Sequence, residues 1–499
     1  MTEELPDGWV WASVGEVAET TLGKMLDRAK NTGEHAVPYL RNVNVQWGHI
    51  DLTDVLSMEI PPEKQELFRL QEGDLIICEG GEIGRCAMWA GGVSYMAFQK
   101  ALHRVRTFRG VEAKYLLYVF EFLSRSGKLL PYATGSTIKH IPQQKLRNIR
   151  FPLPPSSEQR KITTVLEVEL SRLDAADRQL ARAQERLVNL RARFVEETCL
   201  GRGYASDGSA RLAPAGVDDG MVPELPAGWE WKRLQEVADV VGGVTKDARK
   251  QSDPDCAEVP YLRVANVQKG ELDLTQVKTI RVPPKKASQL ELLPGDVLLN
   301  EGGDRDKLGR GWVWEGQIPG CIHQNHVFRA RVRDEVIHPK LLSWHANEFG
   351  QRWCQANGKQ SVNLASISLS KIRLLPVPVP PEEEQAELVK KLETAMSVFD
   401  RTAEQLASAR VKAAALRQAL LNTAFTGKLI PQDPADEPAS VLLDRLKAER
   451  ASVPAPKRGR RTATPKATSA PVRTSSATPT RIADDPQPVH AGEQTTLEF

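Results

Sequence analysis

The sequence lacks the features of a membrane-inserted or secreted protein. No apolar run approaches the ~20 residues that cross a bilayer, and the acidic start MTEELPDGW does not have the form of a secretory signal. Cysteine is scarce, with six residues and no CxxC pair, so we expect no disulfide framework. These absences predict a cytoplasmic protein with reduced thiols and no contact with a membrane.

Motifs of self-contained enzymes are also missing. The chain has neither a GxxxxGK[ST] phosphate loop nor a GxGxxG that opens a helix. The glycine-rich stretch EGGEIGR at 79–85 favours a tight turn over an anion-binding loop. Glu79 and Glu301 lack a neighbouring His or Asp pattern that would complete a catalytic site. Cys321, His323 and His326 carry zinc-ligating atoms without an apparent fourth ligand, so we expect no metal site.

Charge of one sign is not in excess. Lys and Arg number 67 and Asp and Glu number 64, which leaves a net charge of +3. A nucleic-acid surface would therefore have to be a local patch. The 499 residues, 41% of them hydrophobic, suffice for about three domains with ordinary cores.

What the sequence does contain is a long internal repeat. The segment VPYLRNVNVQWGHIDL at 37–52 returns as VPYLRVANVQKGELDL at 259–274, and GDLIICEGG from Gly73 returns as GDVLLNEGG from Gly295. The offset between the copies drifts only from 220 to 226 residues. In each copy, short apolar runs between Gly, Pro and Asn predict strands and turns, while 114–123 and 339–349 predict short helices. We expect two similar mixed α/β domains with long loops.

A long helix is predicted after each domain. Ser156 and Gln159 match a capping box, and Gly201 and Gly427 are suitable C-terminal stops. Apolar residues then recur every seven positions, and adding 226 to each number of the first series gives the second. This period predicts a coiled-coil seam, formed by Leu166, Leu173, Leu180, Leu187, Phe194, Leu392, Phe399, Leu406 and Leu420, with Leu190 and Leu416 alongside.

Matched helices in one chain most simply pack against each other. An antiparallel pair would be a spacer ~60 Å long with approximate two-fold symmetry; in the alternative, each helix packs on its own domain. The expected divisions are 1–155 and 224–381 for the two domains, 156–201 for the first helix, 202–223 for a linker, 382–450 for the second helix and a short C-terminal helix, and 451–499 for a disordered basic tail.

The duplicated order of motifs resembles the specificity subunit of type I restriction-modification systems. Two LPxGW…PYLR…NV…EGG…GR blocks alternate with the two heptad helices from about Leu5 to Arg450, and the second helix ends in TAFTGKL. The resemblance implies target recognition domains that each read one half of a bipartite double-stranded DNA site. It also implies helices that set the spacing and dock two methyltransferase subunits, which restriction/translocase subunits join.

The resemblance further implies a chain without catalysis or cofactor of its own. S-adenosylmethionine, ATP and Mg would belong to the partner subunits of the adenine methyltransferase/endonuclease complex. The alternative is a coiled-coil adaptor of a defence complex without sequence-specific DNA binding.

Candidate DNA contacts follow from comparing the two copies. Residues that both copies share, such as Arg41 and Arg263, should brace the domain or hold phosphate, whereas polar residues at which the copies differ should be sought as base readers. The candidates of the second kind are Lys24, Arg28, Lys30, Lys100, Lys139, His140, Lys246, Arg249, Arg305, Lys307, Asn325, His326, Lys359, Gln360 and Asn363.

Overall fold

The computed structural model describes residues 4–26, 33–136, 139–202, 212, 216–220, 222–360 and 365–452. Helices and small sheets alternate along these residues, so the predicted mixed α/β class is confirmed. None of the described helices is long and apolar enough to span a membrane. We call residues 4–155 the first lobe and residues 222–381 the second lobe.

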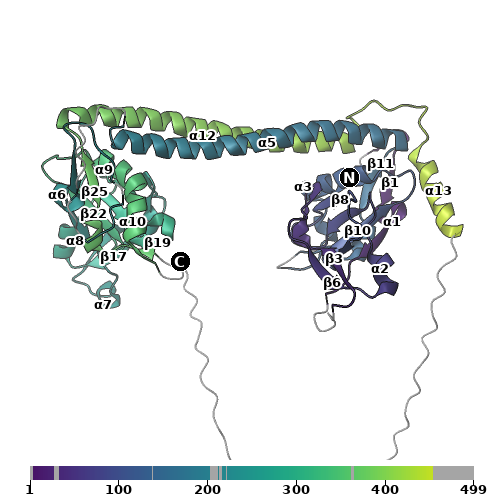
Figure 1. The fold of residues 1–499 in the computed structure, drawn as a ribbon, viewed down its shortest axis with the longest axis horizontal. Coiled ribbons are helices and arrows are strands. Elements are labelled where there is room, and N and C mark those ends of the chain that lie inside the picture. Colours follow the sequence, from purple (N-terminus) through teal and green to yellow (C-terminus); the bar gives the residue numbers. More distant parts are fainter. Residues whose placement is uncertain are drawn as a thin grey trace, which may run out of the picture. The chain divides into compact units, whose positions relative to one another are not determined.

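The first lobe is built on one four-stranded and one three-stranded sheet (Figure 1). The four-stranded sheet has the order β2 (Ala18–Leu22), β10 (Leu102–Thr107), β7 (Leu75–Cys78) and β8 (Cys86–Met88). The other has the order β6 (Leu56–Glu59), β3 (Ala36–Leu40) and β9 (Ala97–Phe98). The pairs β1 (Val10–Ser13) with β11 (Arg150–Leu153) and β4 (Val45–Gln46) with β5 (His49–Ile50) complete the strands. The helices are α1 (Val14–Val17), α2 (Pro62–Phe68), α3 (Ala113–Arg125) and α4 (Gln143–Arg147).

The second lobe repeats this plan with one addition. Its sheets have the orders β13 (Ala238–Gly242), β22 (Val327–Val332), β18 (Val297–Asn300), β20 (Gly311–Val313) and β17 (Lys278–Val282), β14 (Ala257–Leu262), β21 (Ile322–His323). The pairs are β12 (Glu230–Arg233) with β25 (Pro376–Val379) and β15 (Val267–Gln268) with β16 (Glu271–Leu272). The addition is a sheet of β19 (Gly302–Gly303), β24 (Ala365–Ser366) and β23 (Lys359–Gln360). The helices are α6 (Leu234–Val237), α7 (Ala248–Gln251), α8 (Pro284–Leu290), α9 (Pro339–His345), α10 (Gln351–Asn357) and α11 (Leu369–Ile372).

The helix predicted at 339–349 has an irregular middle. A π-helical turn at Ala346–Gly350 joins α9 to α10, so the helical stretch runs on to Asn357. The predicted helix at 114–123 is confirmed as α3, whose buried face includes Tyr115, Phe120 and Phe122.

Two helices of 44 residues follow the lobes: α5 (Ser156–Cys199) and α12 (Glu382–Phe425). They lie side by side (Figure 1) and run in opposite directions, because Asp177 pairs with Arg410 while the later Arg191 pairs with the earlier Asp400. Phe194 meets Phe399 edge to face, with ring centroids 6.0 Å apart. Gly201 and Gly427 follow the helix ends with φ of 63° and 72°, as their predicted stop role requires.

Contacts at the ends of the helices recur with a shift of 220 to 226 residues. Arg191–Asp400 is matched by Arg417–Asp174, and Lys114–Glu167 by Lys340–Glu393. A third match is the indole of the lobe, since Trp9 Nε1 donates to Glu158 and Trp229 Nε1 to Glu384. Each lobe therefore meets the start of its own helix through the same chemistry.

The predicted seam is only partly buried. Leu166 and Leu392 are fully buried, but they belong to the cores of the lobes. Leu173, Leu180, Leu187, Phe194, Phe399, Leu406 and Leu420 are half-buried. Leu190 and Leu416, expected beside the seam, are 56% and 58% exposed. Two helices can cover only one side of each other, so the outer apolar positions stay open along the middle of the pair.

The predicted capping box at the start of α5 is wrong. Pro155 is the N-cap, and Ser156 Oγ donates to the Gly110 carbonyl oxygen at 2.6 Å. Gln159 accepts a hydrogen bond from Glu112 N–H at 2.8 Å and donates to the Pro154 carbonyl. Gln385 makes the equivalent bonds to His338 and Pro380. These side chains fasten the helix to its lobe rather than to its own first turn.

The C-terminal helix α13 (Ala439–Ser452) packs on the first lobe through Leu442, Leu443 and Leu446. Val441 is 44% exposed, whereas Leu443 takes a buried position. The first two residues of the tail predicted at 451–499 belong to α13, and the others lie outside the described residues.

Candidate nucleic-acid interface

Four segments far apart in the sequence meet at one edge of the first lobe. Lys24 N–H donates to the Phe98 carbonyl, and Lys100 N–H donates to the Lys24 carbonyl, both at 2.9 Å. Glu79 joins the third and fourth segments, since its N–H bonds the Ala101 carbonyl and its carbonyl accepts from Ile141 N–H. The predicted residues Lys24, Lys100, Lys139 and His140 are thereby brought together, although up to 116 positions (140 − 24) separate them in the sequence.

The second lobe builds the same edge from equivalent segments. Asn325 N–H donates to the Val244 carbonyl at 2.9 Å, and Glu301 bonds through its backbone to His326 and Ile367. Strand β23 carries Lys359 and Gln360 and joins this edge through β24 and β19. Four predicted residues therefore converge here: Asn325, His326, Lys359 and Gln360. Lys246 follows two residues after Val244, which bridges to Gln324.

The glycines of this edge serve close strand packing, and the tight turn predicted within 79–85 is present, since Arg85 N–H donates to the Glu82 carbonyl at 3.2 Å. Gly302 pairs with Ser366, and a Cβ on Gly302 would lie 2.9 Å from the Ala365 carbonyl oxygen. Gly80 bridges to His140 in the same way. The turn itself comes later, at Gly84, whose φ is 83°. The EGG motif therefore forms the short strand β19 in the second lobe and a single bridge at Gly80 in the first lobe.

The tips of both hairpins are incompletely described. Residues 137–138 lie outside the described residues, as do the predicted sites Arg28, Lys30 and Asn363. The flanking Lys139, Lys359 and Gln360 are exposed.

The arginines that both copies share have a bracing role. Arg41 pairs with Asp54 and also donates to its carbonyl at 3.0 Å. Among the described residues, the Arg263 guanidinium donates to the Gln276 carbonyl, at 3.5 Å. The neighbouring Asn44 is buried and bonds three backbone groups, including Arg41 N–H at 2.8 Å. Of the two roles expected for this repeated segment, bracing is the one that the contacts support.

Other predicted sites are occupied or lie elsewhere. Lys307 forms an ion pair with Asp304 beside β19, and the adjacent Arg305 is exposed. Arg249 lies on α7, which packs against β17 rather than on the convergent edge.

A buried histidine lies beneath each edge. His103 Nε2 bonds the Ile141 carbonyl oxygen at 2.9 Å, and His323 Nδ1 bonds the Val327 carbonyl oxygen at 2.6 Å. Burial lowers the pKa of each to about 4, so both are neutral at pH 7. Within the part of the chain that the structure describes, Cys321, His323 and His326 do not gather into a metal-binding group.

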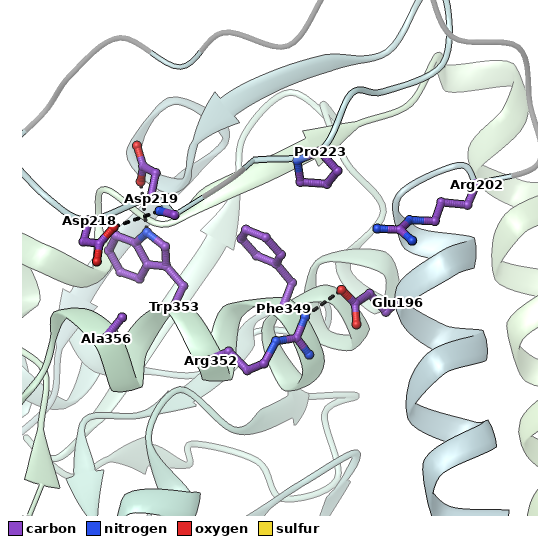
Figure 2. A pocket seen from close by; sticks show the side chains of 10 residues that line it. Glu196, Arg202, Asp218, Asp219, Pro223, Phe349, Arg352, Trp353 and Ala356 are labelled. Atoms are coloured by element: carbon purple, nitrogen blue, oxygen red, sulfur yellow. Dashed lines mark hydrogen bonds and ion pairs between the residues drawn. The ribbon is translucent and has the colours of Figure 1, made fainter.

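Sequence reasoning missed the contribution of the linker. Asp219 accepts two hydrogen bonds from Arg233, at 2.9 and 2.8 Å. It also accepts one from Trp353 at 3.0 Å (Figure 2). The Asp218 N–H donates to Asn357 Oδ1, and Asn357 Nδ2 donates to the Asp218 carbonyl. Part of the predicted linker is thus fixed on the second lobe. Beside it is a cavity of about 280 Å³ that also reaches Arg202, Phe349 and Arg352.

The chain is similar in sequence to known proteins. Residues 6–179 match the family model described as the type I restriction modification DNA specificity domain. The StySPI specificity subunit of Salmonella potsdam is 24% identical over 90% of this chain and 96% of its own length. The EcoKI specificity subunit of Escherichia coli (strain K12) is 23% identical over 90% of this chain and 97% of its own.

Solved structures show the same fold. A chain from a study of complex assembly in the type I R-M system aligns with a TM-score of 0.66 and 20% identity, over 85% of this chain and all of its own. The HsdS subunit from Thermoanaerobacter tengcongensis aligns with a TM-score of 0.50 and 20% identity, over 86% of this chain and all of its own. This chain is therefore similar in sequence to the specificity subunits of type I restriction-modification systems, and its fold is similar to those of the two solved chains.

Proposed function

We propose that this chain is the non-catalytic subunit that gives a type I restriction-modification complex its DNA specificity. Each lobe reads one half of a bipartite double-stranded site. The observation that carries the proposal is the recurrence of one convergent edge in both lobes, with a shared backbone frame and different polar side chains. Lys100, Lys139 and His140 lie at this edge in the first lobe, and Asn325, His326 and Lys359 lie at it in the second lobe. Shared frames with different side chains suit two readers of different half-sites.

The antiparallel helix pair supports the spacing role. A helix of 44 residues is about 65 Å long at 1.5 Å per residue, which exceeds one DNA turn of ~34–36 Å. We propose that the pair separates the two readers as a coiled-coil spacer with pseudo-two-fold symmetry. Such symmetry presents equivalent surfaces to two identical methyltransferase subunits.

The open middle of the helix pair supports a protein-docking role. A groove of about 450 Å³ is lined by Ala183, Leu187, Leu190 and Leu406, with Arg182 and Arg186 at its rim. Val188, Val398 and Val411 are also exposed, at 60% or more. Apolar surface of this kind marks protein-binding sites. In this proposal the methyltransferase subunits cover it, restriction/translocase subunits join them, and those partners bring S-adenosylmethionine, ATP and Mg.

Exchanging one lobe tests the bipartite assignment. Replacing residues 1–155 with the first domain of another specificity subunit should change one half of the methylated sequence and leave the other half unchanged. The measurement is methylation mapping by long-read sequencing in cells that also make the methyltransferase. A change in both halves would contradict the assignment of one half-site to each lobe.

The exposed apolar helix face equally favours an adaptor that binds protein alone, and salt dependence separates the two functions. Phosphate contacts release counterions, so DNA affinity should fall steeply with salt. The double variant Lys100→Ala/Lys139→Ala should lower the slope of log K against log[salt] by about 2, roughly 1 for each lost contact. The control is Lys64→Ala, an exposed lysine on α2. If the unaltered complex bound DNA without salt dependence, the adaptor function would be favoured.

A further inference from the structure

Glu79 and Glu301 occupy the same place in the two lobes. Glu79 N–H donates to the Ala101 carbonyl at 2.9 Å, and its own carbonyl accepts from Ile141 N–H at 2.8 Å. Glu301 N–H donates to the His326 carbonyl, and its carbonyl accepts from Ile367 N–H, both at 2.9 Å. Both backbone polar groups of each glutamate are thus held by the two neighbouring segments. The Cα positions of both glutamates are therefore fixed, and the partner of each carboxylate depends on the side chains around it.

The two carboxylates have different surroundings. Glu301 Oε2 lies 2.7 Å from His326 Nδ1, and Asn325 Nδ2 lies 3.3 Å from His326 Nε2. In the first lobe, Ala101 stands at the place of His326, because it supplies the equivalent carbonyl to the glutamate N–H. Among the described residues, none forms a hydrogen bond or ion pair with the Glu79 carboxylate. In the second lobe the glutamate carboxylate therefore orients the His326 imidazole. In the first lobe the equivalent carboxylate has no partner among the described residues.

An open carboxylate among cations does not fit phosphate binding. Its charge repels the DNA backbone, whereas Lys24, Lys100 and Lys139 on the adjoining segments attract it. In the major groove, however, a carboxylate accepts a hydrogen bond from the amino group of cytosine. A base that offers only an acceptor at that position would leave the carboxylate buried without a donor, which is costly. The rigid backbone of Glu79 adds to the discrimination between bases, because a backbone that is already held loses little conformational freedom on binding.

We propose that Glu79 is a base-reading residue of the first lobe, which selects a base with a major-groove amino group, cytosine above all. In the second lobe the same carboxylate orients His326, and His326 and Asn325 make the base contact instead. This inference rests on the proposed DNA-specificity function. It also revises the expectation that residues common to both copies serve only as frame, because a shared residue with a different partner can read different bases.

Selection from randomised DNA tests the inference on the full chain with its methyltransferase subunit. Glu79→Gln keeps the shape but adds a donor, so it should reduce the preference at one base pair of one half-site by about 10-fold or more. Ala101→His should provide the missing imidazole and reduce the preference at the same base pair. His326→Ala should release Glu301 and shift the preference in the other half-site only. Glu82→Gln is the matched control from the same loop, because Glu82 already accepts from Trp47 Nε1 at 2.7 Å.

The outcomes separate the two levels of the proposal. If the unaltered complex selects no motif, the DNA-specificity function itself fails. If the unaltered complex selects a motif and Glu79→Gln leaves every position unchanged, or alters the affinity for all sequences equally, the inference alone fails. Thermal melting of each variant establishes that it folds, and Glu79→Gln by itself decides the question should Ala101→His not fold.

Discussion

Replacing Arg417 with methionine should lower the free energy of unfolding by about 3 kcal/mol. The Arg417 guanidinium donates to Glu121 at 2.6 Å and also pairs with Asp174, so it joins α12 to α3 and α5. The Glu121 side chain is only 4% exposed, and removing one partner of a buried pair leaves a charge that the core cannot solvate. We expect the lower end of the usual range because Arg125 still donates to Glu121 at 2.8 Å. Urea denaturation, followed by far-UV circular dichroism, measures the loss.

The internal repeat supplies the control for this experiment. Arg191 occupies the position equivalent to Arg417, but its partner Asp400 is 56% exposed. Among the described residues, no ion pair joins Arg191 to a buried carboxylate. Exposed ion pairs contribute at most ~1 kcal/mol, so Arg191→Met should have a small effect. Equal losses in the two variants would show that Glu121 contributes nothing beyond the surface pair. The comparison isolates the buried carboxylate because both changes remove the same side chain from the same kind of helix.

Acidification should destabilise both lobes before the carboxylates are protonated. Burial lowers the pKa of His103, His323 and His345 from 6.5 to about 4. A lowered pKa means that the folded chain holds these rings neutral while the unfolded chain protonates them below pH 6.5. Their contribution is therefore complete above pH 6.5 and is lost as the pH falls toward 4. The largest loss per histidine is about 3 kcal/mol, from 1.36 kcal/mol per unit of pKa.

The hydrogen bonds of the three histidine rings explain why burial disfavours their protonation. In each ring one nitrogen bonds a backbone carbonyl, and the other has no partner among the described residues. Protonation would place an N–H donor in the core without an acceptor. His103→Phe should flatten the stability profile between pH 6.5 and 4, since the equivalent position on β22 already holds Phe328. It should also cost about 1–3 kcal/mol at pH 7, because the Ile141 carbonyl loses its donor.

Chemical denaturation at several pH values measures this profile. His49→Asn, a change on an exposed strand, controls for the loss of one histidine. An unchanged slope in His103→Phe would mean that the buried ring does not titrate in this range.

Much of the fold was predictable because it depends on local patterns. The seven-residue apolar period and the Pro-Pro boundaries predicted long helices, and α5 and α12 begin at residues 156 and 382 as expected. The helix 114–123 was predicted from its apolar spacing, and it is present as α3. Periodicity of this kind is a property of neighbouring residues, so it needs no knowledge of the rest of the molecule.

The partners of polar side chains were not predictable in this way. Ser156 and Gln159 have the sequence of a capping box, yet they bond Gly110 and Glu112, which lie more than 40 positions earlier. Leu190 and Leu416 have the spacing of seam residues but remain exposed, because only one neighbouring helix is available to cover them. Local and distant partners compete for these side chains, and the local sequence pattern does not reveal which partner is bound.

The sequence by itself determined the duplication, the mixed α/β class and the two matched helices, since each is encoded in repeated motifs and apolar spacing. Only the tertiary structure decided that Lys24, Glu79, Lys100 and His140 meet at one edge, because backbone hydrogen bonds between non-adjacent segments bring them there. It alone distinguished the open carboxylate of Glu79 from the paired carboxylate of Glu301, which the repeat makes identical in sequence. The difference arises from the side chain across the edge, Ala101 or His326, and a contact across 22 or 25 positions is invisible to local pattern.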